Sequence, residues 1–248
     1  MIKQIIKKAI KASVYEAIGE RLEWIENQNS ELIYAQVWKD TMQGIEWAQD
    51  IPSISPGRWA VGYNYLYVMT RVLEELRPHK VLDIGLGIST SFFSTYFRHM
   101  NYEDGIHTVI EQDTSWRDFY LQKHAISKAT HIYTSDLEIK NINGKDYYAF
   151  GDISNIVAGK KYDVISIDAP WGSDELSRRD ILDYIPQCLE EEFVIIMDDT
   201  NRRGELTTLK EIENILRMTN VEFAVGTYRG TTECTVITSK KLGFLCTC

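Results

Sequence analysis

Carboxylates follow two apolar segments of the sequence and could share one site. Asp168 ends the segment 162–168 (YDVISID), and Asp198 and Asp199 end the segment 192–199 (EFVIIMDD). If these segments are adjacent parallel strands, the three acids meet at one edge of a sheet. Such a group of acids can remove a proton as a general base, or hold a cation that lowers the pKa of a hydroxyl.

Both kinds of chemistry have candidate residues. Asp168, Asp199 and Asn201 offer the hard oxygen ligands that Mg²⁺ or Mn²⁺ accepts, so we predict a divalent metal there. Without a metal, Asp168 or Asp198 would act as the general base, with Arg202 completing the catalytic set. The alternative without chemistry is that these acids cap helices and loops and pair with the nearby arginines.

A glycine-containing turn follows the first apolar segment, 79–87 (HKVLDIGLG). Gly85 permits a tight turn, and Gly87 lets the backbone approach a ligand at the N-terminus of the next helix. Glu111 ends the second apolar segment, 24 residues after Gly87. A carboxylate there can accept hydrogen bonds from both ribose hydroxyls of an adenosine group. Together these features predict an adenosine cofactor.

The details favour S-adenosylmethionine (SAM) over a dinucleotide. A pyrophosphate prefers a third glycine, where this chain has Thr90, and no tyrosine has a lysine four residues later, as a short-chain dehydrogenase requires. SAM carries no phosphate and favours an acid such as Asp83 in the first turn. The residues predicted to bind the cofactor are Asp83, Gly85, Gly87, Ser89, Thr90, Glu111, Asp136 and Asp168.

Four motifs resemble those of the polysaccharide-biosynthesis methyltransferases typified by glucuronoxylan 4-O-methyltransferase. The likeness covers about residues 59–205, and Asp198 stands where that family typically has His. The layout is also similar to that of bacterial metal-dependent sugar O-methyltransferases. The motifs are GLG (85–87), IEQDTSW (110–116), IDAPWG (167–172) and DTNRRGE (199–205).

The resemblance implies SAM-dependent O-methylation of a sugar in a surface polysaccharide or its nucleotide-linked precursor, often with a divalent metal. It implies that Gly85, Gly87 and Glu111 hold SAM, and that Asp168, Asp199, Asn201 and Arg202 form the floor of the reaction site. A methyltransferase for a non-sugar hydroxyl and a non-catalytic scaffold in a glycan-assembly complex are the alternatives. Intact Gly85, Gly87, Glu111 and Asp168 argue against the scaffold.

Five further residues are predicted to contact the acceptor. Trp171 can stack on the apolar face of a sugar ring, although simple packing in its loop is equally compatible with the sequence. Arg203, with its neighbour Arg202, can neutralise a uronic acid or a diphosphate, or else balance nearby acids. The segment 57–67 precedes the first strand and can fold over cofactor and acceptor. From it we select Arg58, Trp59 and Tyr63.

Alternating strands and helices must position these residues. They predict an α/β fold, a doubly wound Rossmann-like sheet of the class I methyltransferase type, mostly parallel and closed by two antiparallel strands over 221–240. A helix is expected over about 176–190. We expect a helical segment at 1–58 and a SAM-binding catalytic domain at 59–248.

Composition limits the partners. The formal net charge of −9 argues against nucleic acid as a partner. Four scattered cysteines suggest reduced thiols and a cytoplasmic protein. The N-terminal segment 2–25 alternates isoleucines at helical spacing with lysines. We expect this helix to pack on its own domain or on a second copy in a homo-oligomer, the alternative being peripheral contact with an anionic membrane.

Overall fold

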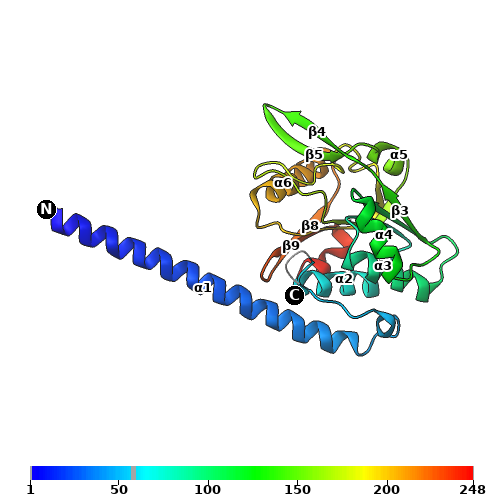
Figure 1. Cartoon of the computed structure of the whole chain (residues 1–248), viewed down its shortest axis with the longest axis horizontal. Coiled ribbons are helices and arrows are strands. Elements are labelled where there is room, and N and C mark those ends of the chain that lie inside the picture. The colour runs from blue at the N-terminus through cyan, green and yellow to red at the C-terminus, as the bar shows by residue number, and fades with distance from the viewer. Residues whose placement is uncertain (1, 57–59, 248) are drawn as a thin grey trace.

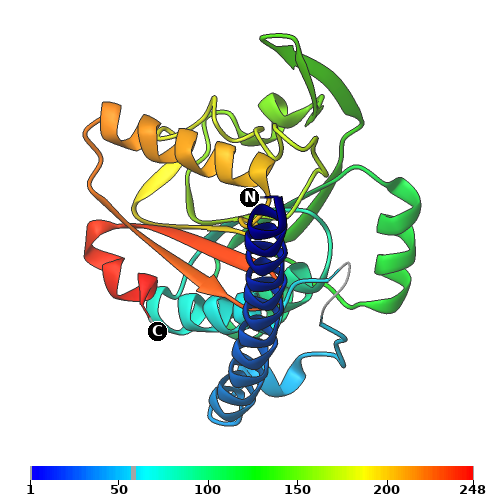
Figure 2. The same ribbon diagram turned by 90° about the vertical axis from the view of Figure 1, so that its left-hand side faces the viewer.

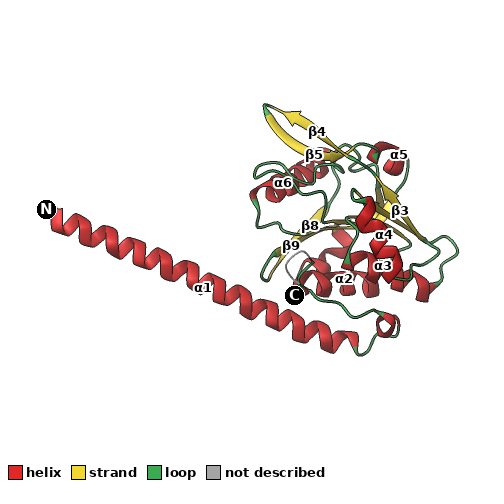
Figure 3. Cartoon of the chain, viewed as in Figure 1, coloured by secondary structure: helices red, strands yellow, loops and turns green. Residues whose placement is uncertain are grey.

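The structure is a computed structural model that describes residues 2–56 and 60–247, with side chains from residue 14 onward. Two predicted acceptor residues, Arg58 and Trp59, lie outside the described residues. Figure 3 shows the helices and strands by type. In chain order they are α1 (Ile2–Met42), the 3-10 helix η1 (Trp47–Asp50), α2 (Tyr63–Leu76), β1 (Lys80–Ile84), α3 (Ile88–Met100), β2 (Ile106–Glu111), α4 (Thr114–Lys123), β3 (Thr130–Thr134), β4 (Leu137–Ile142), β5 (Lys145–Phe150), α5 (Ile153–Val157), β6 (Tyr162–Ile167), β7 (Leu189–Met197), α6 (Arg203–Met218), β8 (Phe223–Arg229), β9 (Glu233–Ser239) and the 3-10 helix η2 (Lys240–Cys246).

Seven strands form the central sheet, in the order β3-β2-β1-β6-β7-β9-β8. The neighbours from β3 to β7 are all parallel, whereas β9 runs antiparallel to both β7 and β8. The predicted α/β fold, a mostly parallel sheet with a C-terminal antiparallel hairpin, is confirmed. The strand order changes direction between β1 and β6, and ligands of such sheets bind outside the carboxyl ends of the strands at that point.

Apolar residues cover both faces of the sheet, as a parallel sheet requires. Val81 and Val164 belong to the core cluster that contains α2 and α3, whereas Leu82 and Ile165 belong to the cluster that contains α6. Figure 1 shows α2 and α3 on one side of the sheet and α6 on the other. Trp47 of η1 is buried in the first cluster, so the N-terminal segment contributes to the core.

A second, two-stranded sheet was not expected. Strands β4 and β5 pair antiparallel and extend beyond the main sheet (Figure 1). Their turn has Asn143 at φ 54° and Gly144 at φ 81°, the left-handed conformations that an Asn-Gly hairpin turn needs. The Asn-Gly pair was the available sequence signal for this hairpin.

The helix expected over 176–190 is wrong, because this segment forms loops and turns up to β7. Arg178 adopts a left-handed backbone (φ 52°), and Pro186 has no backbone N–H to donate. The side chains of Arg178 and Asp180 are buried instead of facing solvent as on an amphipathic helix. Asp180 accepts a hydrogen bond from the backbone N–H of Phe150 at the end of the hairpin.

Helix α1 leaves the domain over most of its length, as Figures 1 and 2 both show. Its C-terminal part packs on the domain, where Trp38 donates a hydrogen bond to Thr70 of α2 (3.1 Å). The Glu31 carboxylate accepts from the backbone N–H of Tyr63 (2.6 Å) and of Thr231 (3.2 Å), which ties α1 to the start of α2 and to the β8–β9 turn. Among the described residues, no helix combines the length and the hydropathy needed to cross a bilayer.

Candidate active site

A cavity of about 920 Å³ opens at the carboxyl ends of β1, β2 and β6. The glycine turn (Gly85–Ser89) and Glu111 lie along it, and Asp168 with Trp171 lines it as well. Further lining comes from the segments 53–55 and 60–61, before α2, and from α4. The cavity therefore joins the residues predicted for the cofactor to some of those predicted for the chemistry and the acceptor.

The two glycines serve different purposes. Gly85 has φ 114°, a conformation that favours glycine, and a Cβ there would also make a tight contact of 3.1 Å with the Cβ of Ala169. A Cβ at Gly87 would meet no atom within 4 Å. Packing within the chain therefore does not explain Gly87, which lines the cavity and leaves room for a ligand close to the backbone.

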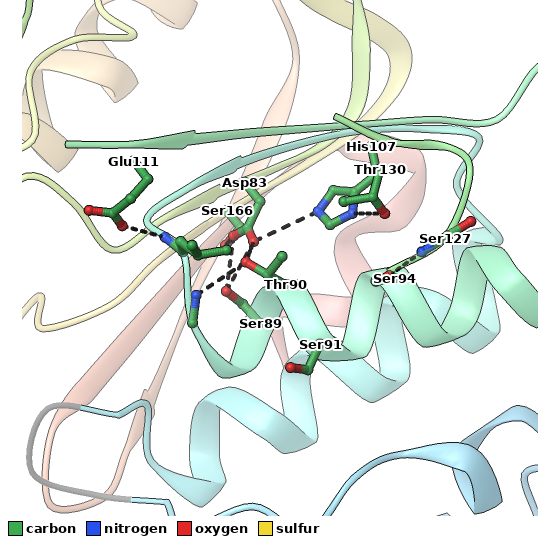
Figure 4. A network of polar contacts seen from close by, with 12 residues as sticks. Asp83, Ser89, Thr90, Ser91, Ser94, His107, Glu111, Ser127, Thr130 and Ser166 are labelled. Carbon is green, nitrogen blue, oxygen red and sulfur yellow. Dashed lines mark hydrogen bonds and ion pairs between the residues drawn. The ribbon is translucent and has the colours of Figure 1, made fainter. Parts of the chain in front are cut away.

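Asp83 lies beneath the glycine turn and is fully buried (Figure 4). Its carboxylate accepts hydrogen bonds from the hydroxyls of Ser89 (3.0 Å), Thr90 (2.6 Å) and Ser166 (2.8 Å). The ring of His107 is 3.7 Å away. Of these residues Ser89 lines the cavity, whereas Asp83 and Thr90 are not part of its lining. Asp83 thus holds the turn in place from below.

Glu111 is buried where β2 ends, and its carboxylate receives three backbone N–H groups. Oε2 accepts from Leu86 (3.0 Å), and Oε1 accepts from Gln112 and Asp113 (2.8 Å each). Burial raises the pKa of Glu111, and the N–H groups oppose that rise. A carboxylate has about four acceptor positions, so one remains for a ligand hydroxyl. Figure 4 shows Glu111 beside the turn that it anchors.

Trp116 and Asp136 differ in where they lie relative to the cavity. Trp116 of α4 was not selected from the sequence, yet it lines the cavity and donates a hydrogen bond to the carbonyl of Leu86 (2.8 Å). The motif IEQDTSW contained it, but no spacing rule marked it. Asp136 is exposed in the loop after β3 and is not part of the cavity lining.

Three carboxylates meet at and behind Asp168, the one of the three that lines the cavity, and are called the acid cluster here: Asp168, Asp198 and Asp199. One oxygen of each lies within 4.8 Å of the others. The expected convergence of the ends of β6 and β7 therefore occurs. Partial burial raises the pKa of Asp168 to about 6, and burial next to Asp168 and Asp199 raises the pKa of Asp198 to about 8.

Arg178 lies inside this cluster and was missed by the sequence analysis. Its Nη2 is 3.0 Å from Asp168 Oδ1 and 2.9 Å from Asp199 Oδ2, and Nη1 donates to the carbonyl of Asp198 (2.7 Å). The side chain is only 4% exposed. Its positive charge lowers the pKa of both Asp168 and Asp198 and so offsets part of the rise caused by burial. The cluster contains its own cation.

Three other predicted residues, Arg202, Arg203 and Asn201, lie nearer the surface than the acid cluster. Arg202 is 59% exposed and pairs with Asp199 at 2.7 Å, so the expected pairing of acids with arginines is partly present. Arg203 lies 3.4 Å from Glu175 instead of contacting the acid cluster. Asn201 is exposed.

Exposed apolar side chains lie around Trp171. Trp171 lines the cavity yet is 63% exposed, and the ring of Tyr148 from β5 lies 6.4 Å from it at 75°. Ile139, opposite Tyr148 in the β4–β5 ladder, is also exposed. We call Ile139, Tyr148 and Trp171 the apolar shelf. Tyr63, in contrast, packs against Trp38 of α1 with ring centres 5.6 Å apart, and it does not line the cavity.

No family model matches the sequence, and no curated protein matches it either. The chain is similar to several solved structures. A putative O-methyltransferase from Klebsiella pneumoniae has 15% sequence identity and a TM-score of 0.46, with 76% of this chain and 83% of that chain covered. The O-methyltransferase from Bacillus cereus in complex with S-adenosylhomocysteine (SAH) has 14% identity and a TM-score of 0.46, with 86% and 91% covered. TomG from Streptomyces achromogenes, an O-methyltransferase involved in tomaymycin synthesis and solved with SAM, has 14% identity and a TM-score of 0.45, with 85% and 89% covered. At these TM-scores the function has to be inferred from the side chains of the site.

Proposed function

We propose that the chain is a SAM-dependent O-methyltransferase. The observation that carries the proposal is the single cavity of about 920 Å³ that Glu111 and the glycine turn line together with Asp168. A nucleoside carrying a sulfonium group needs a ribose anchor at one end and an acceptor beside its methyl group at the other. The cavity offers these in that order.

The residues of the cofactor end have separate tasks in this proposal. Glu111 accepts a hydrogen bond from a ribose hydroxyl with its remaining acceptor position. Gly87 lets the ligand approach the backbone, and Trp116 provides an apolar wall beside it. Asp83 keeps the turn in the conformation that binds, without touching the ligand.

The acid cluster then accepts the proton of the acceptor. As the hydroxyl oxygen attacks the methyl carbon, the O–CH₃ bond forms and the S–CH₃ bond breaks, and SAH leaves as a neutral thioether. The hydroxyl proton moves to a carboxylate, for which Asp198 and Asp168 are the candidates. A base with a pKa near the working pH is the most effective, and a carboxyl with a pKa of about 8 meets that condition. Arg202 is near enough to stabilise charge at Asp199.

A sugar is the proposed acceptor, in a surface polysaccharide or a nucleotide-linked precursor. Support comes from the apolar shelf beside the cavity, because sugar rings stack their C–H faces on exposed aromatic rings. The exposed cations Arg202 and Arg203 can in addition neutralise an acidic sugar or a diphosphate. The shelf is equally suited to a flat aromatic acceptor, so a catechol-like hydroxyl is the second candidate.

The proposal includes a divalent cation bound by the acid cluster. Three carboxylate oxygens within 4.8 Å of one another form a donor set that suits Mg²⁺ or Mn²⁺. When bound, such an ion would lower the pKa of the acceptor hydroxyl. Arg178 already lies between Asp168 and Asp199, so the ion and the guanidinium compete for the same oxygens. Asn201 of the predicted ligand set is exposed.

Two measurements test the proposal in sequence. Calorimetry should show binding of SAM or SAH and none of NAD, and tighter binding of NAD would overturn the cofactor assignment. The protein is then incubated with SAM and a panel of nucleotide sugars, oligosaccharides and catechols, and a mass increase of one methylene group identifies the acceptor. SAM binding without transfer to any sugar, but with transfer to a catechol, selects the second candidate. Binding without transfer to any acceptor would support the non-catalytic scaffold.

Each reaction is repeated with EDTA and after addition of Mg²⁺ or Mn²⁺. Turnover that EDTA abolishes and either ion restores supports the metal, provided SAM binding is unchanged. Full activity in metal-stripped protein excludes the metal and leaves the carboxylate base.

A further inference from the structure

The first part of α1 lies outside the domain. Every described side chain from residue 14 to residue 26 is exposed, and contact with the domain is established at Glu31. Figure 2 looks along the projecting helix from its N-terminal end. Residues 2–30 thus form an arm of about 44 Å at 1.5 Å per residue.

One side of this arm is apolar. Val14, Ile18, Leu22 and Ile25 follow one another at spacings of four, four and three residues, and each is 40–55% exposed. This spacing places them on one side of a helix. Helices held only by their own hydrogen bonds are marginal in water, and most helical stability in proteins comes from packing such a face. The arm therefore needs a partner.

Charge along the arm identifies that partner. Residues 2–13 contain four lysines and no acid, whereas residues 14–30 contain four glutamates and one arginine. An anionic membrane would attract the first half of the arm and repel the second. A second copy in parallel orientation would place like charges side by side. A second copy in antiparallel orientation places the basic half of each arm along the acidic half of the other.

We infer that the chain forms a homodimer through antiparallel pairing of its α1 arms. The register follows from the sequence and from the length of the arm. Isoleucines at 6 and 10 continue the four-residue spacing of Val14, Ile18 and Leu22. Each four-residue step turns by about 40°, so this stripe winds slowly around the arm and the two arms wrap around each other along it. The positions 6, 10, 14, 18, 22 and 25 are nearly symmetric about residue 16. The midpoint of residues 2–30 is also residue 16. Position 14 then lies opposite position 18 of the other copy, and the N-terminus of each arm ends where the partner's domain begins.

Cross-linking distinguishes this arrangement from a parallel one. Ile18→Cys and Ile25→Cys lie on the same apolar side and serve as a matched pair, in full-length protein carrying Cys246→Ser and Cys248→Ser. In the antiparallel register the two copies of position 18 are offset by about 6 Å along the helices, and those of position 25 by about 27 Å. A short bismaleimide should therefore cross-link Ile18→Cys and not Ile25→Cys. Equal cross-linking of both variants would show a parallel dimer and overturn the inference.

Charge reversal tests the complementarity. Changing the four lysines at 3, 7, 8 and 11 to glutamate should weaken dimerisation at least about tenfold in light scattering or sedimentation. Changing Glu16, Glu20, Glu23 and Glu26 to lysine in the same chain should restore it. A monomeric wild-type protein would also overturn the inference, and sedimentation of that monomer with phosphatidylserine vesicles would assign the arm to membranes. Binding of SAM is expected to be the same in all variants.

Discussion

Two buried carboxylates, Asp83 on β1 and Asp198 after β7, have opposite surroundings. Asp83 receives three hydroxyl hydrogen bonds, and its network extends through Ser166 to the hydroxyl of Tyr65. Asp198 has acids for neighbours, and its side chain has a long contact of 3.5 Å with Thr232. Hydroxyl donors stabilise a charged carboxylate, whereas nearby negative charge favours the protonated form.

The difference separates a structural acid from a reactive one. A carboxylate fully engaged by donors keeps one position and holds the turn above it. A carboxyl whose pKa is raised to about 8 exchanges its proton near neutral pH, which is the property that a general base needs. Arg178 supplies one buried positive charge among the three carboxylates of the acid cluster, and this charge offsets the repulsion between them.

The largest effect is expected from a change at Asp198, the reactive carboxylate of the two. Asp198→Asn retains the shape of the side chain but cannot accept the proton, so kcat should fall by about 10²–10⁴. SAM binding, measured by calorimetry, should stay within about twofold. Asp136→Asn, on an exposed residue outside the cavity, is the control and should leave both quantities unchanged. A kcat for Asp198→Asn close to that of the wild type would transfer the role of base to Asp168.

Removal of the internal cation should show how the acid cluster is held together. Arg178→Met removes the cation that pairs with three buried or half-buried carboxylates, Asp168, Asp199 and Glu205. Breaking a buried ion pair in this way costs about 3–5 kcal/mol. Denaturant unfolding measures that loss. Arg202→Met is the matched control, because Arg202 is 59% exposed and solvent screens its pair with Asp199 to about 1 kcal/mol. Equal losses in the two variants would contradict a special role for Arg178.

Local signals explain which parts of the site could be predicted. The strands are continuous apolar runs, and their ends carry Gly85, Glu111, Asp168 and the Asp198–Asp199 pair, so the sheet rule alone brings these residues to one edge. The glycine turn could be predicted because the backbone conformation that it needs depends on a few neighbouring residues. The mostly parallel sheet follows from the alternation of strands and helices, and the C-terminal hairpin follows from two consecutive strand-like segments over 221–240.

Tertiary contacts explain what could not be predicted. Arg178 belongs to a segment that was expected to be a helix, and its role depends on three acids from two other segments. Tyr148 reaches the apolar shelf only because an unexpected hairpin places it beside Trp171. Conversely, nothing in the sequence around Asp136 shows that its side chain points to solvent.

Protonation of Asp198 should affect how kcat and the free energy of unfolding change with pH. Because the base works when deprotonated, kcat should rise about tenfold per pH unit well below a midpoint near 8, or about 50-fold between pH 6 and pH 8. Stability should change in the opposite direction. The folded protein keeps a proton on Asp198 between about pH 4 and pH 8 that the unfolded chain has lost, so the free energy of unfolding decreases as pH rises through this range. Asp198→Asn should remove the slope of the stability curve between about pH 6 and pH 8. An unchanged curve would mean that Asp198 is ionised throughout.

The smallest effect is expected from a change at Asp83, the structural carboxylate of the two. Asp83→Asn keeps the size of the side chain but replaces one acceptor oxygen with a donor that faces the hydroxyls of Ser89, Thr90 and Ser166, so unfolding should become easier by about 1–3 kcal/mol. The turn then holds its conformation less firmly, which should weaken SAM binding and raise its KM. At saturating SAM, however, kcat should stay close to the wild-type value, because Asp83 binds the hydroxyls beneath the turn and does not belong to the acid cluster. Ser166→Ala removes one of the three donors and should reproduce the loss of stability in part. A loss of kcat as large as that of Asp198→Asn, with stability unchanged, would show that Asp83 takes part in the reaction and that the two carboxylates are not divided in this way.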